Sequence, residues 1–137
     1  MSEYAGDLSP SEAWDVLRED PDAVLVDVRT RAEWGYVGVP DLSEIGKQAV
    51  LVEWQTYPEG SRNPSFVDQL RRAGVGPGAR AVFLCRSGVR SIAAAQAATE
   101  AGLGPAHNVL DGFEGQLDDE GHRGGGWRGQ GLPWRQS

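Results

Sequence analysis

Short apolar runs alternate along the chain with segments whose apolar residues recur at helical spacing. Near-continuous apolar runs occupy residues 24–28, 49–52 and 81–84, and a shorter one lies at 108–110. Runs of this length predict strands that are buried on both faces. Because helical segments lie between the strands, the order predicts an α/β fold: a mostly parallel central sheet with helices on both faces.

Capping residues predict where the helices begin. Ser9-Pro10-Ser11-Glu12 combines a serine cap, a proline at the first helical position and a glutamate three residues after the cap. Thr30-Arg31-Ala32-Glu33 is a second capping box and opens a short helix. Asn63-Pro64 predicts a third helix, and the alanine-rich run from Ser91 predicts a fourth, each ended by a glycine.

The composition changes from Gly121 onward, where six glycines are interleaved with Trp127 and Trp134. Glycine at this density predicts no packed element, because it gives the backbone freedom and offers no side chain to bury. The tryptophans predict a tail that lies over the domain surface. We therefore expect one main domain over residues 1–120 and a C-terminal tail, 121–137, packed on the same domain.

Length and charge narrow the function classes. A chain of 137 residues is long enough for one domain with a core of its own. The net charge of −7 argues against nucleic acid and against an anionic membrane as partner. No stretch approaches the roughly 18 apolar residues of a membrane span, and residues 1–4 lack the features of a signal peptide. We expect a cytoplasmic protein.

Cys85 is the only cysteine, at the end of an apolar strand and followed by a glycine-containing loop and a helix. Loop amides and a helix N-terminus at this place stabilise a thiolate and hold an anion beside it. Arg86 and Arg90 flank the thiol and add local positive charge. A cysteine at the end of a strand is otherwise a small buried apolar residue. With no second cysteine, a covalent intermediate on Cys85 must be resolved by another molecule.

Other candidates also fall at or just past the ends of predicted strands, where open parallel sheets bind their ligands. Asp27 is either an anchor for the loop or an acid–base group. Arg29 either pairs with Glu33 on a helix surface or belongs to the pocket. Trp54 either lines the pocket or packs in the core. Nothing in the sequence argues for a cofactor or metal, since the two histidines stand alone, without ligand spacing.

The run Cys85-Arg86-Ser87-Gly88-Val89-Arg90 resembles the active-site loop of the rhodanese-like sulfurtransferases. Residues 27–34 resemble the same family's Asp-x-Arg-x-x-x-Glu-aromatic motif. Further matches are Asp111-Gly112-Phe113 and a closing element from Trp127 to Pro133, so that the resemblance covers roughly residues 8–133. The chain departs from the family at Gly38, where a histidine is usual.

The resemblance implies a rhodanese-like fold and a persulfide relay. Cys85 would take sulfane sulfur from thiosulfate or another small anionic donor and pass it to cyanide, a thiol or a protein thiol. Five loop residues would bind the donor: Arg86, Ser87, Gly88, Val89 and Arg90. Of the two arginines, Arg86 is expected to contact the donor anion, whereas Arg90 either does so or pairs with Asp27 or Asp111. Asp27, Arg29 and Trp54 would support the site.

Three other functions compete with thiosulfate sulfur transfer. Tyrosine phosphatases use a Cys-x₅-Arg loop, but only four residues separate Cys85 from Arg90, and the tighter ring suits sulfur better than phosphate. A non-catalytic rhodanese-like module would bind a partner or sense a small anion. A sulfur-relay component would be loaded by a protein persulfide and would pass the sulfur to another enzyme.

Overall fold

A parallel five-stranded sheet is the centre of the computed structural model, which describes residues 4–56 and 60–136. Its strands lie in the order β1 (Gly6–Leu8), β6 (Gly104–Val109), β5 (Pro77–Leu84), β2 (Val24–Asp27) and β4 (Val50–Leu51). Every neighbouring pair is parallel, which confirms the predicted α/β architecture. The expectation about a signal peptide concerns residues 1–4, of which 1–3 lie outside the described part.

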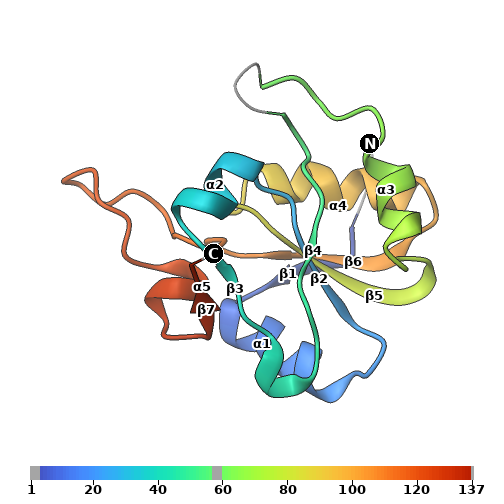
Figure 1. Ribbon diagram of the computed structural model, residues 1–137, viewed down its shortest axis with the longest axis horizontal. Helices are drawn as coiled ribbons and strands as arrows, with labels where there is room; N and C mark the ends of the chain where they lie inside the picture. The colour runs from blue at the N-terminus through green and yellow to red at the C-terminus, as the bar shows by residue number, and fades with distance from the viewer. Residues whose placement is uncertain (1–3, 57–59, 137) are drawn as a thin grey trace.

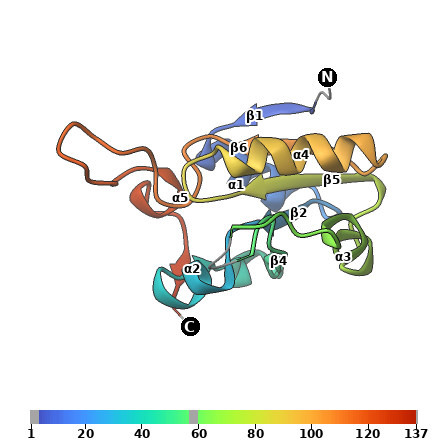
Figure 2. The same ribbon diagram turned by 90° about the horizontal axis from the view of Figure 1, so that it is seen from above.

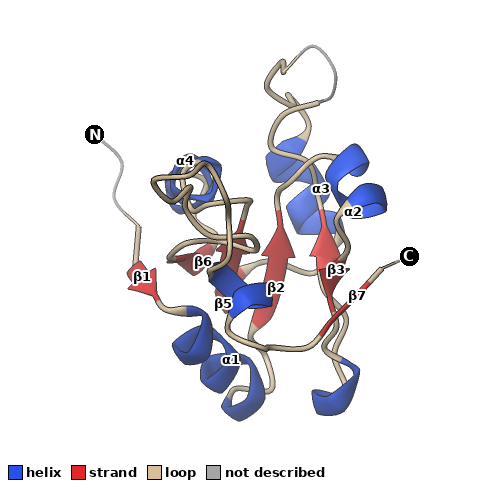
Figure 3. Ribbon diagram, turned by 90° about the vertical axis from the view of Figure 1, so that its left-hand side faces the viewer, coloured by secondary structure: helices blue, strands red, loops and turns tan. Residues whose placement is uncertain are grey.

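Helices cover both faces of the sheet (Figure 1, Figure 3). One face carries α3 (Phe66–Arg72) and α4 (Arg90–Glu100), and the other carries α1 (Pro10–Glu19). Figure 2 shows α4 running along β5 and β6. The short helix α2 (Arg31–Tyr36) follows β2, and a 3₁₀ turn, η1 (Ser43–Ile45), precedes β4. None of the described helices is long and apolar enough to cross a membrane.

The buried strands supply side chains alternately to two apolar clusters. Val26 and Phe83 face the cluster beneath α3 and α4, whereas Leu25 and Val82 face the cluster beneath α1. This alternation follows from the two-residue period of a strand. It explains why the strand sequences are apolar at nearly every position. Both predicted capping boxes are present, at Ser9 and at Thr30.

Three very short strands are not predicted by the sequence pattern. β1 adds to the edge of the sheet beside β6, and β3 (Val39–Pro40) pairs antiparallel with β7 (Trp134–Arg135). Elements of two or three residues carry no periodicity. They form because distant backbone groups lie opposite them, and this information is not local.

The expectation that the glycine-rich segment builds no packed element is wrong. Residues Gly126–Gly129 form α5, and Trp127 is fully buried, with its ring 5.8 Å from that of Trp14. Glycine allows the close approach: a Cβ on Gly126 would lie 2.6 Å from the Gly112 carbonyl oxygen. The division of the chain at residue 120 stays a prediction.

Candidate active site

Cys85 follows β5, the middle strand of the sheet, and α4 begins five residues later. Asp27 ends the neighbouring strand β2 and lies opposite Leu84 in the register, so Asp27 and Cys85 stand at the same edge of the sheet. The thiol residue is only 1 % exposed. The sequence thus locates the thiol on a strand-to-helix loop, at the carboxyl ends of parallel strands, where such sheets bind ligands.

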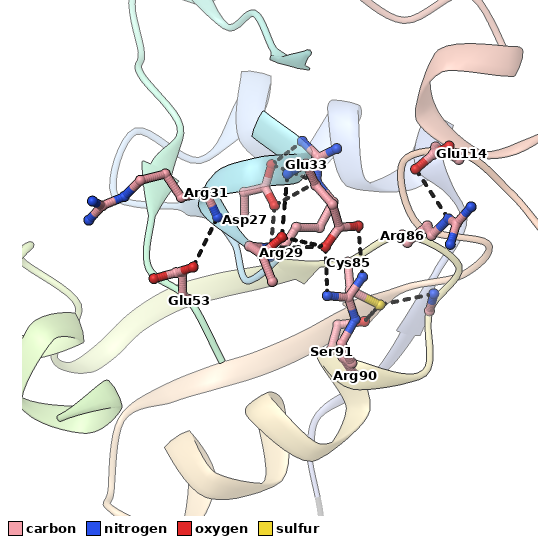
Figure 4. Close-up of polar contacts among 12 residues, drawn as sticks. Asp27, Arg29, Arg31, Glu33, Glu53, Cys85, Arg86, Arg90, Ser91 and Glu114 are labelled. Atoms are coloured by element: carbon pink, nitrogen blue, oxygen red, sulfur yellow. Dashed lines mark hydrogen bonds and ion pairs between the residues drawn. The ribbon is translucent and has the colours of Figure 1, made fainter. Parts of the chain in front are cut away.

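Two groups hold the sulfur of Cys85 (Figure 4). The backbone N–H of Gly88 donates to Sγ at 3.1 Å, and the Ser91 hydroxyl lies 3.2 Å from Sγ. Gly88 has φ +100°, a conformation that favours glycine. A Cβ there would lie 3.2 Å from the Asp111 nitrogen, so the loop's path leaves no free space for a side chain. The thiol is therefore buried, but a loop amide is directed at it.

The turn after β6 supports the start of this loop through the backbone. Phe113 N–H donates to the Cys85 carbonyl at 2.8 Å, and Glu114 N–H donates to the Arg86 carbonyl at 2.9 Å. Trp127 N–H in turn donates to the Gly112 carbonyl at 2.8 Å. The C-terminal segment thus binds the turn after β6, and the turn binds the carbonyl groups of Cys85 and Arg86.

Arg90 forms a two-point ion pair with Glu33 of α2, at 2.8 and 2.9 Å. These bonds raise the pKa of Arg90. Burial raises the pKa of Glu33, but the bonds and charge of Arg90, with those from Thr30, outweigh it and bring that pKa below its ordinary value. The alternative in which Arg90 pairs with Asp27 or Asp111 is wrong. The carboxylate that pairs with Arg90 is Glu33.

Arg29 does not form the surface pair with Glu33 that its spacing suggests. It is fully buried and pairs with Asp27, with Nη2 at 2.6 Å from Oδ2. The same Nη2 donates to the Gly38 carbonyl at 2.7 Å, and the guanidinium carbon lies 4.3 Å from the centre of the Phe113 ring. The Asp27–Arg29 pair therefore ties the end of β2 to the segment around residue 38.

Gly38 stands where the related motif has a histidine, and the structure gives the reason for a glycine. Its φ is +112°, and a Cβ would lie 2.7 Å from the Arg135 carbonyl oxygen and 2.9 Å from the Trp134 ring. Both neighbours belong to β7, which pairs with β3 directly after Gly38. The C-terminal strand fills the space that a histidine side chain would need.

Trp54 lies in the core. Its ring packs edge-on against Phe66 with centroids 5.0 Å apart, the guanidinium of Arg62 lies over it at 4.7 Å, and it is 8 % exposed. This matches the core alternative of the two that the sequence leaves open.

An open cleft of about 650 Å³ adjoins the loop. Its lining comes from α2, the residues flanking the thiol in sequence and the turn after β6, and includes Glu33, Tyr36, Arg86, Ser87, Arg90 and Glu114. Arg86 is half exposed, and its Nε lies 3.4 Å from a Glu114 oxygen. The loop residue Val89 is 68 % exposed. The cleft thus presents two arginines of the Cys85 loop, each with a carboxylate partner, and a third arginine, Arg123, whose Nη1 donates to the Gly115 carbonyl.

The arrangement can hold an anionic sulfur and accept a small ligand in the cleft beside the loop. Ser91, Glu33 and Glu114 take part in it but are not predicted as site residues. Ser91 was identifiable in principle, because it directly follows Arg90 at the start of the helix. Among residues 4–56 and 60–136, no three His, Cys, Asp or Glu side chains are grouped so as to hold a metal ion.

Comparison with known proteins relates the chain to one family. A family model described as the STR4 middle domain matches residues 5–137. The crystal structure of Rv0390 from M. tuberculosis is 59 % identical, covers 98 % of this chain and all of its own, and superposes with a TM-score of 0.91. The uncharacterised protein RC0915 of Rickettsia conorii is 38 % identical over 126 residues, which are 91 % of this chain and 93 % of that protein.

More distant matches carry descriptive names. The chloroplastic protein THYLAKOID RHODANESE-LIKE of Oryza sativa is 31 % identical over 130 residues, which cover 94 % of this chain but 25 % of the plant protein. The polysulfide-sulfur transferase homodimer of Wolinella succinogenes has a TM-score of 0.66 at 24 % identity, over 96 % of this chain and 78 % of its own. The latter likeness is one of fold.

Proposed function

Because the chain belongs to the STR4 middle domain family, a group of rhodanese-like domains, we propose that it is a sulfurtransferase that carries sulfane sulfur on Cys85. The observation that carries this proposal is the Gly88 amide directed at the buried sulfur, 3.1 Å away. A structural cysteine needs no such donor, whereas a thiolate is stabilised by one.

The reaction would proceed by two displacements at sulfur. The Cys85 thiolate attacks the outer sulfur of the donor, a new S–S bond forms, and the donor's own bond to that sulfur breaks. The leaving group, sulfite from thiosulfate or a thiolate from a persulfide, departs with the electron pair. An acceptor nucleophile, a thiol or cyanide, then attacks the outer sulfur and Cys85 leaves as thiolate. Sulfur is transferred without an external oxidant or reductant.

The residues around Cys85 fit separate parts of this scheme. The Gly88 amide and the Ser91 hydroxyl lie at the sulfur, where negative charge appears when the thiolate leaves. Arg86 lines the cleft and is half exposed, which suits contact with a donor anion. Arg90 is held by Glu33 and would fix the start of α4 beside the loop. Asp27 and Arg29 pair with each other and bond the neighbouring backbone, which suits a supporting role.

One observation favours a specific alternative within the same chemistry. Each arginine beside the thiol already has a carboxylate partner, Glu33 for Arg90 and Glu114 for Arg86. A dianion such as thiosulfate must share the arginines with these carboxylates, whereas a donor that carries its sulfur on a thiol has less charge to accommodate. A relay component loaded by a protein persulfide is therefore the second candidate. A free, cycling thiol fits the reducing cytoplasm in either case.

The test is sulfur transfer and intact mass on the full chain. Wild type and Cys85→Ser are incubated with thiosulfate or with a low-molecular-weight persulfide. The intact mass of each protein is then measured by mass spectrometry before and after treatment with a thiol reductant. We expect a reductant-sensitive gain of one sulfur in wild type and none in Cys85→Ser. Loading by the persulfide but not by thiosulfate favours the relay component. No gain with either donor overturns the proposal and favours a binding or sensing module.

A further inference from the structure

A chain of hydrogen bonds runs from the Cys85 sulfur to the edge of the sheet. The Ser91 hydroxyl lies 3.2 Å from Sγ and also bonds Asn108 Oδ1. Asn108 Nδ2 donates to Asp7 Oδ1 at 3.0 Å, and Tyr4 donates to the same oxygen at 2.8 Å. Ser91 and Asn108 are fully buried, whereas Asp7 is exposed on β1. These hydrogen bonds join α4, β6 and β1, although Asp7 and Asn108 are 101 positions apart in the sequence.

Asp7 fixes which way the Asn108 amide points. An ionised carboxylate only accepts hydrogen bonds, so Asn108 must present its NH₂ group to Asp7 and its carbonyl oxygen to Ser91. The Ser91 hydroxyl carries a single hydrogen. It can donate this hydrogen to Asn108 or to the sulfur of Cys85, but not to both.

The two protonation states of Cys85 therefore differ in how many groups of the hydrogen-bond chain have a partner. With a neutral thiol, S–H donates to Ser91 Oγ, Ser91 donates to Asn108, and every group has a partner. When the thiol proton leaves to water, the Ser91 hydrogen turns to the thiolate, and the buried Asn108 oxygen loses its donor. A buried acceptor without a donor is costly. The anchored amide thus disfavours the free thiolate.

We propose that Asp7 and Asn108 are positioning residues that act through Ser91 to restrain ionisation of Cys85. The inference rests on the proposed function for its consequence in turnover. In the persulfide, the negative charge sits on the outer sulfur and the inner sulfur is no longer an anion. Ser91 can then donate to Asn108 again, while Gly88 still donates to Sγ. The hydrogen-bond chain therefore destabilises the free thiolate more than the persulfide, and so it favours transfer of sulfur onto Cys85.

Charged groups from other elements also face this region. Arg90 of α4 interacts electrostatically with Cys85 and is paired with Glu33 of α2. Arg86, next to Cys85 in the loop, is paired with Glu114 after β6. The Asp27–Arg29 pair stands at the end of β2. All of these pairs are untouched by a change at Asp7, so an Asp7 variant isolates the hydrogen-bond chain from them.

The test compares Asp7→Ala with Tyr4→Phe in the full chain. Water that replaces the Asp7 carboxylate can donate as well as accept, so Asn108 can rotate and donate to Ser91, which frees the hydroxyl for the thiolate. We expect iodoacetamide to alkylate Asp7→Ala on the order of tenfold faster than wild type at neutral pH, the ratio for one hydrogen bond to a charged group. The thiolate absorbance at 240 nm should also appear at lower pH. Tyr4→Phe removes only the other bond to Asp7 and should react as wild type does.

A second background tests the route through Ser91. In Ser91→Ala, the added Asp7→Ala change should have no further effect, because the hydroxyl that links the two is gone. Equal alkylation of Asp7→Ala and wild type, with matching thermal unfolding, overturns the inference. An Asp7→Ala effect that persists without Ser91 also overturns it, since the Asp7 charge would then act directly. Alkylation needs no sulfur donor, so these results are separate from failure of sulfur transfer.

Discussion

Replacing Gly88 by alanine tests whether the loop amide is what holds the sulfur. Gly88 has φ +100°, and an added Cβ would lie 3.2 and 3.3 Å from backbone atoms of Asp111 and Val109. Left-handed backbone at a residue with a side chain costs about 1–3 kcal/mol. The loop should relax to relieve this, and the N–H of residue 88 should turn away from the thiol.

The size of the effect follows from the lost bond. A hydrogen bond to a charged group contributes about 1.5–3 kcal/mol, and about 1.4 kcal/mol corresponds to a factor of ten. We therefore expect the thiolate fraction at a fixed pH below full ionisation to fall roughly ten- to a hundredfold in Gly88→Ala. Alkylation by iodoacetamide and the rate of sulfur loading should fall with it.

The matched control is Gly78→Ala. Gly78 also has a left-handed φ, +82°, but open space surrounds the position of its Cβ, and it lies at the opposite end of β5 from the thiol. The Gly78→Ala variant should lose stability by the same backbone effect, while its Cys85 reacts at the wild-type rate. If Gly88→Ala alkylates as fast as Gly78→Ala, the amide does not stabilise the thiolate and the reasoning fails.

Three further predictions concern charge and packing. Because the pKa of Glu33 is lowered by folding, its ion pair stabilises the protein fully above its ordinary pKa of 4.5 and loses this contribution as the pH falls through the lowered value. Urea denaturation should find Glu33→Gln less stable than wild type near neutral pH, by about 1–3 kcal/mol, and a gap that persists in strong acid contradicts this. Arg86→Ala should raise KM for thiosulfate by the factor that corresponds to a loss of about 1–3 kcal/mol in binding free energy. Glu114→Gln should lower KM. An unchanged KM in steady-state assays refutes the assignment of Arg86 to the donor. Trp127→Ala should cost about 3–5 kcal/mol in urea denaturation, whereas Trp134→Ala, at a residue 40 % exposed, should cost much less. Equal losses would contradict the buried role of Trp127.

The sequence predicts the central elements because they are long or have local signals. β2 and β5 are apolar enough to be recognised as buried strands, and the capping boxes at Ser9 and Thr30 place the starts of two helices. α5 is different. Its glycines are needed for close backbone approach, and from the sequence alone such glycines look the same as those of a loose tail.

The loop around Cys85 is visible in the sequence because its residues are adjacent, but its partners are not. Arg90 meets Glu33 across 57 positions of sequence, and this contact depends on how α2 is placed after β2. The spacing of Arg29 and Glu33 supports a surface pair as one of the two alternatives for Arg29. However, Arg29 comes before α2 begins, so the spacing rule does not apply there.

The strand β7 fills the space beside Gly38 that a side chain would occupy. Introducing a histidine at residue 38 would require room now taken by the Trp134 indole and the Arg135 carbonyl oxygen of the C-terminal strand. Making Trp134 small would relieve only the indole contact, because the Arg135 carbonyl oxygen 2.7 Å away and the left-handed φ of residue 38 would remain. The substitution therefore also needs a new backbone path for residue 38 and β7. This loop and the chain's C-terminal strand must therefore be redesigned together.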